Sequence, residues 1–360
     1  MKPKALIYVA LAVGLGAPAV QAAELQAVGT IDIPGDAMKA FDISYVDQSD
    51  GRYYFADRSN KSVDIIDTAH DRYVDRIGGF VGVVLKDGKP NNDMSGPDGV
   101  IIAEHQVWAG DGDSHVKIFD AETKKLIGDV NTGGKTRVDE MAFDPKDKIL
   151  VVVNNAEDPP FATLISAQSE HKIIGKVSFS NATDGAEQPA YSAVDDLFYV
   201  SIPEIGGDAK KGGVAVIDPH AGTLVKILPV EGCHPAGLAM GPDGNFLLGC
   251  TADGKEMPAK TIVMNVKSGD VVATVDGLGG SDMVNYNAKN KQYYTASAKN
   301  PGGPVLGVID ATTNKLVQTI ALPGGSPHSV TSSETTGKVY VPVGAQGGGD
   351  GKIHVFAPKG

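Results

Sequence analysis

Several large classes of protein are disfavoured by what this 360-residue sequence has little of. Aromatic residues make up only 6% of it and its formal net charge is −12, so the basic, aromatic-rich surface that binds nucleic acid is not expected. After residue 22 the sequence has no long apolar run, which argues against a membrane span in the mature chain. The GxSxG, HExxH and CxxCH motifs do not occur, so typical serine hydrolases, zinc proteases and covalent haem proteins lack their signatures. The remaining composition is that of an ordinary globular protein with enough apolar residues for a large core.

The first 22 residues have the pattern of a secretory signal peptide. Lys2 and Lys4 precede an apolar stretch over residues 5–16, and small residues follow at Val20 and Ala22. A retained anchor is the alternative. The pattern predicts a signal peptide over residues 1–22 and a single domain over residues 23–360, exported to the periplasm or secreted.

The sequence has only two cysteines, Cys233 and Cys250. They flank the segment HPAGLAMGPDGNFLLG, which has the pattern strand, Gly-Pro-Asp-Gly turn, strand. The ends of such a hairpin come together, and an exported protein folds in an oxidising compartment, so we predict a disulfide between them. Two separate buried thiols are the alternative.

An internal repeat dominates the rest of the chain. Its unit is an apolar run, a turn, a few polar residues and a second apolar run, and its copies are DIIDTAHDRYVDRI, KIFDAETKKLIGDV, TLISAQSEHKIIGKV, AVIDPHAGTLVKIL, IVMNVKSGDVVATV and GVIDATTNKLVQTI. Successive copies lie about 45 to 53 residues apart, a period that suits one four-stranded propeller blade. Each is preceded by two further short strand patterns, and a seventh, shortened copy ends the chain. The sequence therefore predicts an all-β fold, a seven-bladed β-propeller; an array of β-sandwiches is the alternative.

The two ends of the mature chain explain how the ring closes. The last copy, IHVFAPKG, stops before its outermost strand, whereas LQAVGTIDIP at residues 25–34 resembles the outer-strand text KLVQTIALP. We therefore expect the N-terminal strand to pair into the last blade, which removes an exposed sheet edge.

The segments IDATTNKLVQTIALPGGSPHSV and TTGKVYVPVG resemble the YVTN-type β-propeller repeat of exported bacterial proteins. The resemblance extends over essentially the whole mature chain and implies the propeller architecture. Proteins of this wider group include binding and scaffold proteins, lactone-cleaving enzymes and cofactor-associated propellers, so the resemblance does not select an activity.

Aligning the blades predicts which residues line the central channel. The equivalent positions at the starts of the innermost strands, in blade order, are Asp42, Asp98, Asp139, Ala190, Ala236, Ser281 and His328. A shift of one residue would bring in Glu140 or Asp282 instead. Clustered carboxylates repel one another unless a cation compensates them, so Asp42, Asp98, Asp139 and His328 form a candidate site for Ca²⁺, Mg²⁺ or a transition metal. Aspartates that cap backbone amides at the strand entry are the alternative.

Other polar residues are expected on the same face. The candidate ligand-binding residues are Asp42, Glu140, Asn154, His234, Asp282 and His328, and the candidate catalytic residues are His234 and His328. Calcium-dependent lactonase propellers bring a Glu and several Asn or Asp side chains to one cation, for which Glu140, Asn154 and Asp253 are the available residues.

Two functions follow from these observations. The first is an exported module that binds a metal, a small molecule or a periplasmic protein at one face of the channel. The alternative is a metal-assisted lactonase or a lyase that uses His234 or His328 to move a proton. The sequence leaves open whether the protein is an enzyme.

Overall fold

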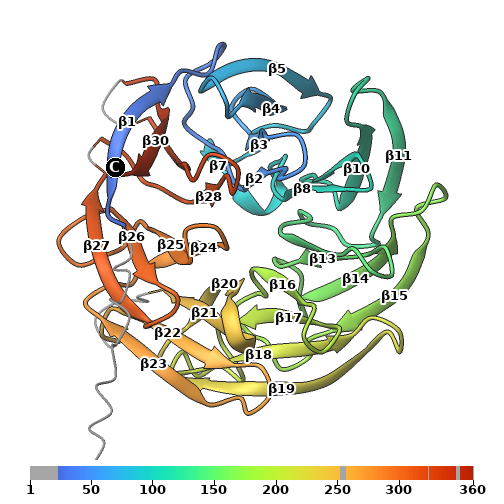
Figure 1. Ribbon diagram of the computed structural model, residues 1–360. Coiled ribbons are helices and arrows are strands. Elements are labelled where there is room, and N and C mark those ends of the chain that lie inside the picture. The colour runs from blue at the N-terminus through green and yellow to red at the C-terminus, as the bar shows by residue number, and fades with distance from the viewer. Residues whose placement is uncertain (1–22, 252–256, 323, 346–348, 360) are drawn as a thin grey trace, which may run out of the picture.

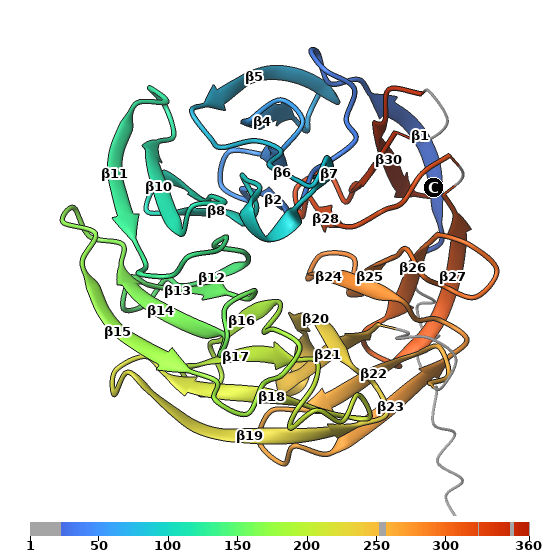
Figure 2. The ribbon, with the colours of Figure 1, turned by 180° about the vertical axis from the view of Figure 1, so that it is seen from behind.

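The computed structural model describes residues 23–251, 257–322, 324–345 and 349–359, and within them it shows a seven-bladed β-propeller (Figures 1 and 2). Each blade is a four-stranded antiparallel sheet, and the seven sheets stand radially around a central channel. The predicted architecture is confirmed. The predicted signal peptide, residues 1–22, and Asp253 lie outside the described residues.

The strands of the first four blades follow in chain order from the channel outwards. Their bounds are β2 (Ser44–Val46), β3 (Arg52–Asp57), β4 (Ser62–Asp67) and β5 (Arg72–Gly78); β8 (Val100–Ala103), β9 (Gln106–Gly110), β10 (His115–Asp120) and β11 (Leu126–Asn131); β12 (Met141–Asp144), β13 (Ile149–Asn154), β14 (Phe161–Ser166) and β15 (Ile173–Ser178); and β16 (Pro189–Ser192), β17 (Leu197–Ile202), β18 (Lys211–Asp218) and β19 (Thr223–Glu231).

The last three blades continue the pattern, with β1 completing blade seven. Their bounds are β20 (Pro235–Met240), β21 (Asn245–Cys250), β22 (Lys260–Asn265) and β23 (Val271–Asp276); β24 (Ser281–Asn287), β25 (Gln292–Ser297), β26 (Val305–Asp310) and β27 (Lys315–Ala321); and β28 (Thr331–Ser332), β29 (Val339–Val343), β30 (Lys352–Pro358) and β1 (Leu25–Ile31).

The core lies between neighbouring blades. All six residues of β13 (sequence ILVVVN) are buried, because this middle strand is covered by a blade on either side. Val151 and Val153 of β13 belong to the same apolar cluster as Phe198 and Val200 of blade four, so each interface between blades is a small core of its own. The outermost strands are partly exposed to solvent; in β15, for example, the side chains of Ile173 and Ile174 are exposed. The fold is thus a ring of packed sheets with a rigid inner wall.

Closure of the ring follows the predicted route. Strand β1 pairs antiparallel with β30, from Leu25 opposite Pro358 to Ile31 opposite Ile353, and so completes blade seven (blue beside red in Figure 1). Leu25 and Ile31 are buried while the residues between them are exposed, so the strand is anchored at both of its ends.

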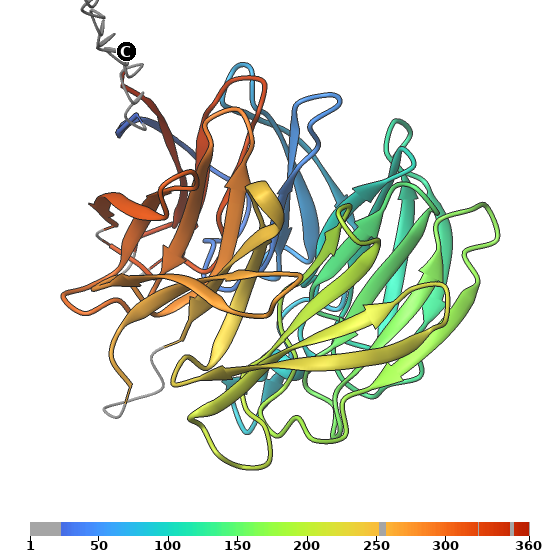
Figure 3. The same ribbon diagram turned by 60° about the horizontal axis from the view of Figure 1, so that its bottom comes forward.

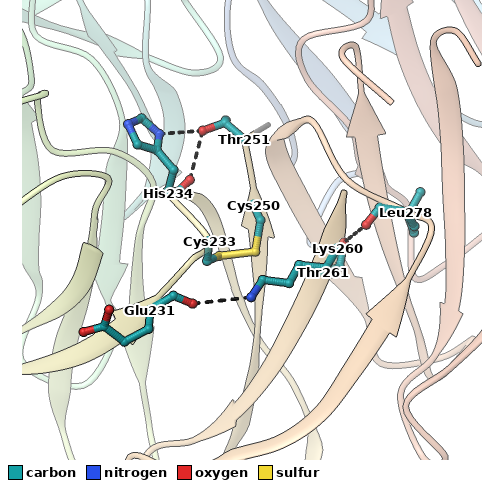
Figure 4. The surroundings of a disulfide bond; sticks show 8 residues. All are labelled: Glu231, Cys233, His234, Cys250, Thr251, Lys260, Thr261 and Leu278. Carbon is teal, nitrogen blue, oxygen red and sulfur yellow. Dashed lines mark hydrogen bonds between the residues drawn. A yellow bond between two sulfur atoms is a disulfide. The ribbon is translucent and has the colours of Figure 1, made fainter. Parts of the chain in front are cut away.

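Cys233 and Cys250 form the predicted disulfide, which joins a residue two positions before the start of β20 to the last residue of β21 (Figure 4). Their Cα atoms are 4.7 Å apart, within the range that a disulfide requires.

Blade two carries an insertion before its first strand. It contains the hairpin β6 (Leu85–Lys86) and β7 (Lys89–Pro90) and a short turn of 3₁₀-helix, η1 (Asn92–Met94), and it reaches over the central channel (Figures 1 and 2). A second short turn, η2 (Pro242–Gly244), joins β20 to β21. Figure 3 shows the ring of blades tilted from the view of Figure 1. No helix in the described part of the chain is long and apolar enough to cross a membrane.

Candidate functional site

A ring of seven equivalent positions surrounds one end of the central channel. In blades one to four the backbone N–H of the ring residue donates to a carbonyl at or near the end of the second strand, over 2.8–3.0 Å. In blades five to seven the ring residue follows Pro235, Ser281 and Pro327, which pair with Cys250, Ser297 and Val343. The seven ring residues are Asp42, Asp98, Asp139, Glu187, Ala236, Asp282 and His328.

Two of the predicted ring positions differ from the structure. Ala190 lies inside β16, opposite Tyr199, and the ring position of blade four is Glu187. Ser281 precedes the ring position of blade six, which is Asp282. A proline precedes both Ala190 and Ala236, but Pro189 pairs with Val200 inside β17, whereas Pro235 pairs with Cys250 at the end of β21, so the two prolines are not equivalent.

The sequence did contain a signal for Glu187, namely the number of residues between the ring position and the start of the second strand of its blade. That strand begins ten residues after the ring position in four blades: Arg52 after Asp42, Ile149 after Asp139, Leu197 after Glu187, and Gln292 after Asp282. Counting back from the more recognisable second strand would therefore have found Glu187.

Arg58 neutralises two of the ring aspartates. It directly follows β3, its side chain is almost fully buried, and its guanidinium contacts the carboxylates of Asp42 and Asp98 together. The bond from its Nε to Asp98 Oδ1 is 2.7 Å long. A buried cation between two buried carboxylates compensates charges that would otherwise be very unfavourable in this position.

Arg137 continues the network into blade three. Its Nη2 lies 2.8 Å from Asp139 Oδ2, its Nη1 lies 3.7 Å from Asp42 Oδ2, and its Nε donates to Asn155 Oδ1 over 3.1 Å. Two arginines thus supply the positive charge for which the sequence suggested a metal ion. The divalent-cation site at Asp42, Asp98, Asp139 and His328 stays a prediction.

His328 is held between two carboxylates. Its Nε2 lies 2.6 Å from Asp42 Oδ1 and its Nδ1 lies 3.1 Å from Asp282 Oδ2. Burial by itself lowers the pKa of His328, but the charges of Asp42 and Asp282 raise it well above the usual value. The imidazole is therefore protonated at neutral pH, with both ring nitrogens donating. In this arrangement His328 acts as a fixed cation rather than as a proton acceptor.

The ring carboxyls divide into an ionised and a more protonated group. Burial opposes ionisation of Asp42, yet Arg58 and His328 hold its pKa well below the usual value. Burial raises the pKa of Asp98 well above its usual value, which Arg58 only partly offsets. Burial, followed by the charges of Asp282 and Asp139, raises the pKa of Glu187 to about 8.

The raised pKa of Glu187 predicts a pH dependence of stability. Between about pH 4.5 and pH 8 the folded chain keeps a proton on Glu187 that the unfolded chain releases, so the free energy of unfolding falls as the pH rises. We expect Glu187→Gln to remove part of this fall and to stabilise the protein by about 1–2 kcal/mol at pH 8, with little change at pH 4.5. Urea unfolding at both pH values measures it. Glu122→Gln, at an exposed site, is the control; equal pH profiles for wild type and Glu187→Gln would contradict the prediction.

His234 occupies a neighbouring position on the same face. Its Nδ1 lies 2.7 Å from the Thr251 hydroxyl, beside the disulfide (Figure 4), and its Nε2 lies 3.0 Å from the exposed carboxylate of Asp184. Asn154, in contrast, is buried in the wall, where its amide donates to Ser114 Oγ and to the Arg137 carbonyl. Asn154 thus supports the loop that carries Arg137.

Three adjoining hollows, here called the upper mouth, open beside the ring. The largest has a volume of about 490 Å³ and is lined by Lys39, Arg58, Asp93, Arg137, Asp282 and His328, among others. The second, about 190 Å³, includes Asp184, Glu187, His234, Asp282 and Lys299, and the third, about 310 Å³, includes Asp93, Glu157, Asp184 and Glu187. Cations therefore predominate on one side of the upper mouth and carboxylates on the other.

The structure brings some predicted residues together and separates others. Asp42, Asp98, Asp139, Asp282 and His328 form one network with Arg58 and Arg137. His234 adjoins this network through a hollow that includes Asp282. Glu140 follows the ring residue Asp139 and lines a different cavity, farther along the channel.

Within the described part of the chain, one group outside the ring has three side chains close enough to share an ion, and the ring residues do not form such a group. The ligand atoms of Asp147, Asp196 and His220 lie within 4.8 Å of one another. Lys146 makes ion pairs with both aspartates, so their charge is already compensated.

A scan of protein-family models and a search of curated proteins found no match to this chain.

Proposed function

We propose that this protein is an exported binding module that holds a small zwitterionic molecule in the upper mouth. The observation that carries the proposal is the division of charge across the adjoining hollows. A ligand with an anionic group and a cationic group at opposite ends would meet the complementary charge at each. The signal-peptide pattern and the disulfide support export.

Lys39 and Asp184 are the groups best placed to contact such a ligand. Both side chains are exposed, and Lys39 makes no ion pair with the residues that the structure describes. Arg58, Arg137 and His328 are engaged with the ring aspartates and supply a positive field rather than free hydrogen-bond donors. Lys39 would bind a carboxylate, and Asp184 would bind an ammonium group.

Calorimetric titration of the mature protein with linear ω-amino acids tests the proposal. The probes are glycine, 4-aminobutanoate and 6-aminohexanoate, with butylammonium and butanoate as analogues that carry one charge. We expect one of the amino acids to bind at least tenfold more tightly than either singly charged analogue, because only the zwitterion engages both sides of the upper mouth.

Two pairs of variants make the test specific. Lys39→Met and Asp184→Asn should each abolish the tenfold preference, while the matched exposed controls Lys226→Met and Asp276→Asn should retain it. Equal binding of all five probes would overturn the proposal. Binding of CaCl₂ or MgCl₂ without binding of any amino acid would overturn it in favour of the divalent-cation prediction.

A further inference from the structure

The central channel contains a second cavity that shares no lining residue with the upper mouth. The innermost strands begin just after the ring and run away from it, and this cavity of about 270 Å³ lies along their later residues. Its wall exposes polar and apolar atoms in similar measure, and its larger side chains are Tyr45, Met141, Phe143, Met240, Met283 and Tyr286. Apolar and aromatic side chains combined with placed polar groups are the usual lining of a small-molecule site.

Among the described residues that line this cavity, Glu140 carries a buried side-chain oxygen without a hydrogen-bond partner. It is 4% exposed, and its Oε2 atom is buried without a hydrogen bond. The neighbouring Gln188 is fully engaged: its Oε1 accepts from the N–H groups of Leu238 and Val284, and its Nε2 donates to the Val284 carbonyl. Buried polar atoms in native proteins almost always have a partner, and the carboxyl of Glu140, a residue that lines the cavity, is left with one oxygen that no protein donor satisfies.

We propose that this cavity binds a small amphipathic cation, an alkylammonium whose head donates to Glu140 and whose hydrocarbon chain lies against the aromatic and methionine side chains. Tyr45, Phe143 and Tyr286 offer ring faces that attract a cation, and methionine side chains adapt to a flexible chain. The ligand differs from the zwitterion proposed for the upper mouth, and the two sites stand on separate observations.

The charges around Glu140 favour a cation over a neutral or anionic ligand. Burial raises the pKa of Glu140 well above its usual value, and the carboxylates of Asp139, Glu187, Asp282 and Asp42 raise it further. These carboxylates belong to four different blades. An ammonium group beside Glu140 would displace its proton and leave an ion pair, so binding should release a proton to the solvent.

Carboxylates also lie near two of the tyrosines that line the cavity. Burial and the nearby Asp47 and Glu334 raise the pKa of Tyr45 to about 12. Burial together with Glu334 and Asp243 also raises the pKa of Tyr286. Both tyrosines line the cavity, so carboxylates lie near this part of its wall as well as around Glu140, and both groups favour a cation over an anion.

Titration of the mature protein with hexylammonium, 1-hexanol and hexanoate tests the proposal. These probes share a six-carbon chain and differ in charge. We expect hexylammonium to bind at least tenfold more tightly than hexanol, and hexanoate to bind more weakly than both. At pH 7 the measured enthalpy of hexylammonium binding should change with the ionisation enthalpy of the buffer, because a proton is released.

Two variants locate the bound cation. Glu140→Gln should retain hexanol binding and lose the tenfold preference for hexylammonium, together with the buffer dependence. Ala190→Phe, at a half-buried position in the cavity wall, should weaken the binding of all three probes, because the larger side chain would fill part of the cavity. It provides the test if Glu140→Gln does not fold.

The results that would overturn the site are distinct from those that would overturn the upper mouth. Equal affinities for hexylammonium and hexanol, or a full preference in Glu140→Gln, would overturn the proposal. Loss of hexylammonium binding in Asp184→Asn with retention in Ala190→Phe would place the cation in the upper mouth and would also overturn it.

Discussion

Replacing Arg58 with methionine is expected to lower the free energy of unfolding at pH 7 by about 3–5 kcal/mol, because breaking a buried ion pair leaves uncompensated charge. Arg58 contacts Asp42 and Asp98 together, and all three side chains are nearly inaccessible to solvent. Urea unfolding of the wild type and Arg58→Met measures the difference. The loss should shrink as the pH falls, since protonated carboxyls need no counter-ion.

Two further variants separate the buried charge from the size of the side chain. Arg72→Met removes an exposed arginine 3.7 Å from Asp67 and should cost less than about 1 kcal/mol. Adding Asp42→Asn to Arg58→Met should recover part of the lost stability, because the carboxylate that loses its buried counter-ion is removed. If Arg58→Met lost no more free energy of unfolding than Arg72→Met, the prediction would be contradicted. Another cation would then have to neutralise Asp42 and Asp98, and the metal content of the Arg58→Met variant would identify it.

Removing the disulfide is expected to lower the free energy of unfolding by about 3 kcal/mol, as chain entropy predicts for a loop of this length. The bond joins residues 17 apart in the sequence and links the entrance of blade five to the end of its second strand. The double variant Cys233→Ser/Cys250→Ser should therefore unfold at a lower urea concentration than the oxidised wild type.

Reduction supplies the matched control for the disulfide. Dithiothreitol should lower the free energy of unfolding of the wild type by a similar amount and leave that of the double serine variant unchanged. Titration of unreduced, denatured mature protein should find almost no free thiol. Two reactive thiols, or a wild type insensitive to dithiothreitol, would contradict the prediction.

The fold could be predicted from the sequence because the strands and turns of each blade are formed by residues that are close together in the chain. The turns near Asp67, Asp120, Asp218 and Asp310 each join the two outer strands of one blade, so a regular period exposes the whole architecture. The closing strand was recognisable by its likeness to the strand that it replaces. Both features can be read from a sequence, because the repeat depends on residues that are close in the chain and the last repeat visibly lacks its outermost strand.

The candidate site depends on partners from different blades, which a sequence does not pair. Asp42, Asp98 and Asp139 were found by alignment because each opens an innermost strand. That Arg58 reaches Asp98 in the next blade, and Arg137 reaches Asp42, depends on the direction of loop side chains. The charge of the ring was therefore predicted, whereas the side chains that neutralise it were not.

The pairing of β1 with β30 also brings the first and last described residues of the chain close together. Leu25 pairs with Pro358, and the Lys359 N–H donates to the Glu24 carbonyl over 2.8 Å, so residues from opposite ends of the chain are neighbours on the rim of blade seven. A short linker between them would connect the ends without crossing the channel, and the chain could be reopened in the outer turn of another blade. Such a circular permutant would retain every blade while moving its termini to a chosen point on the circumference.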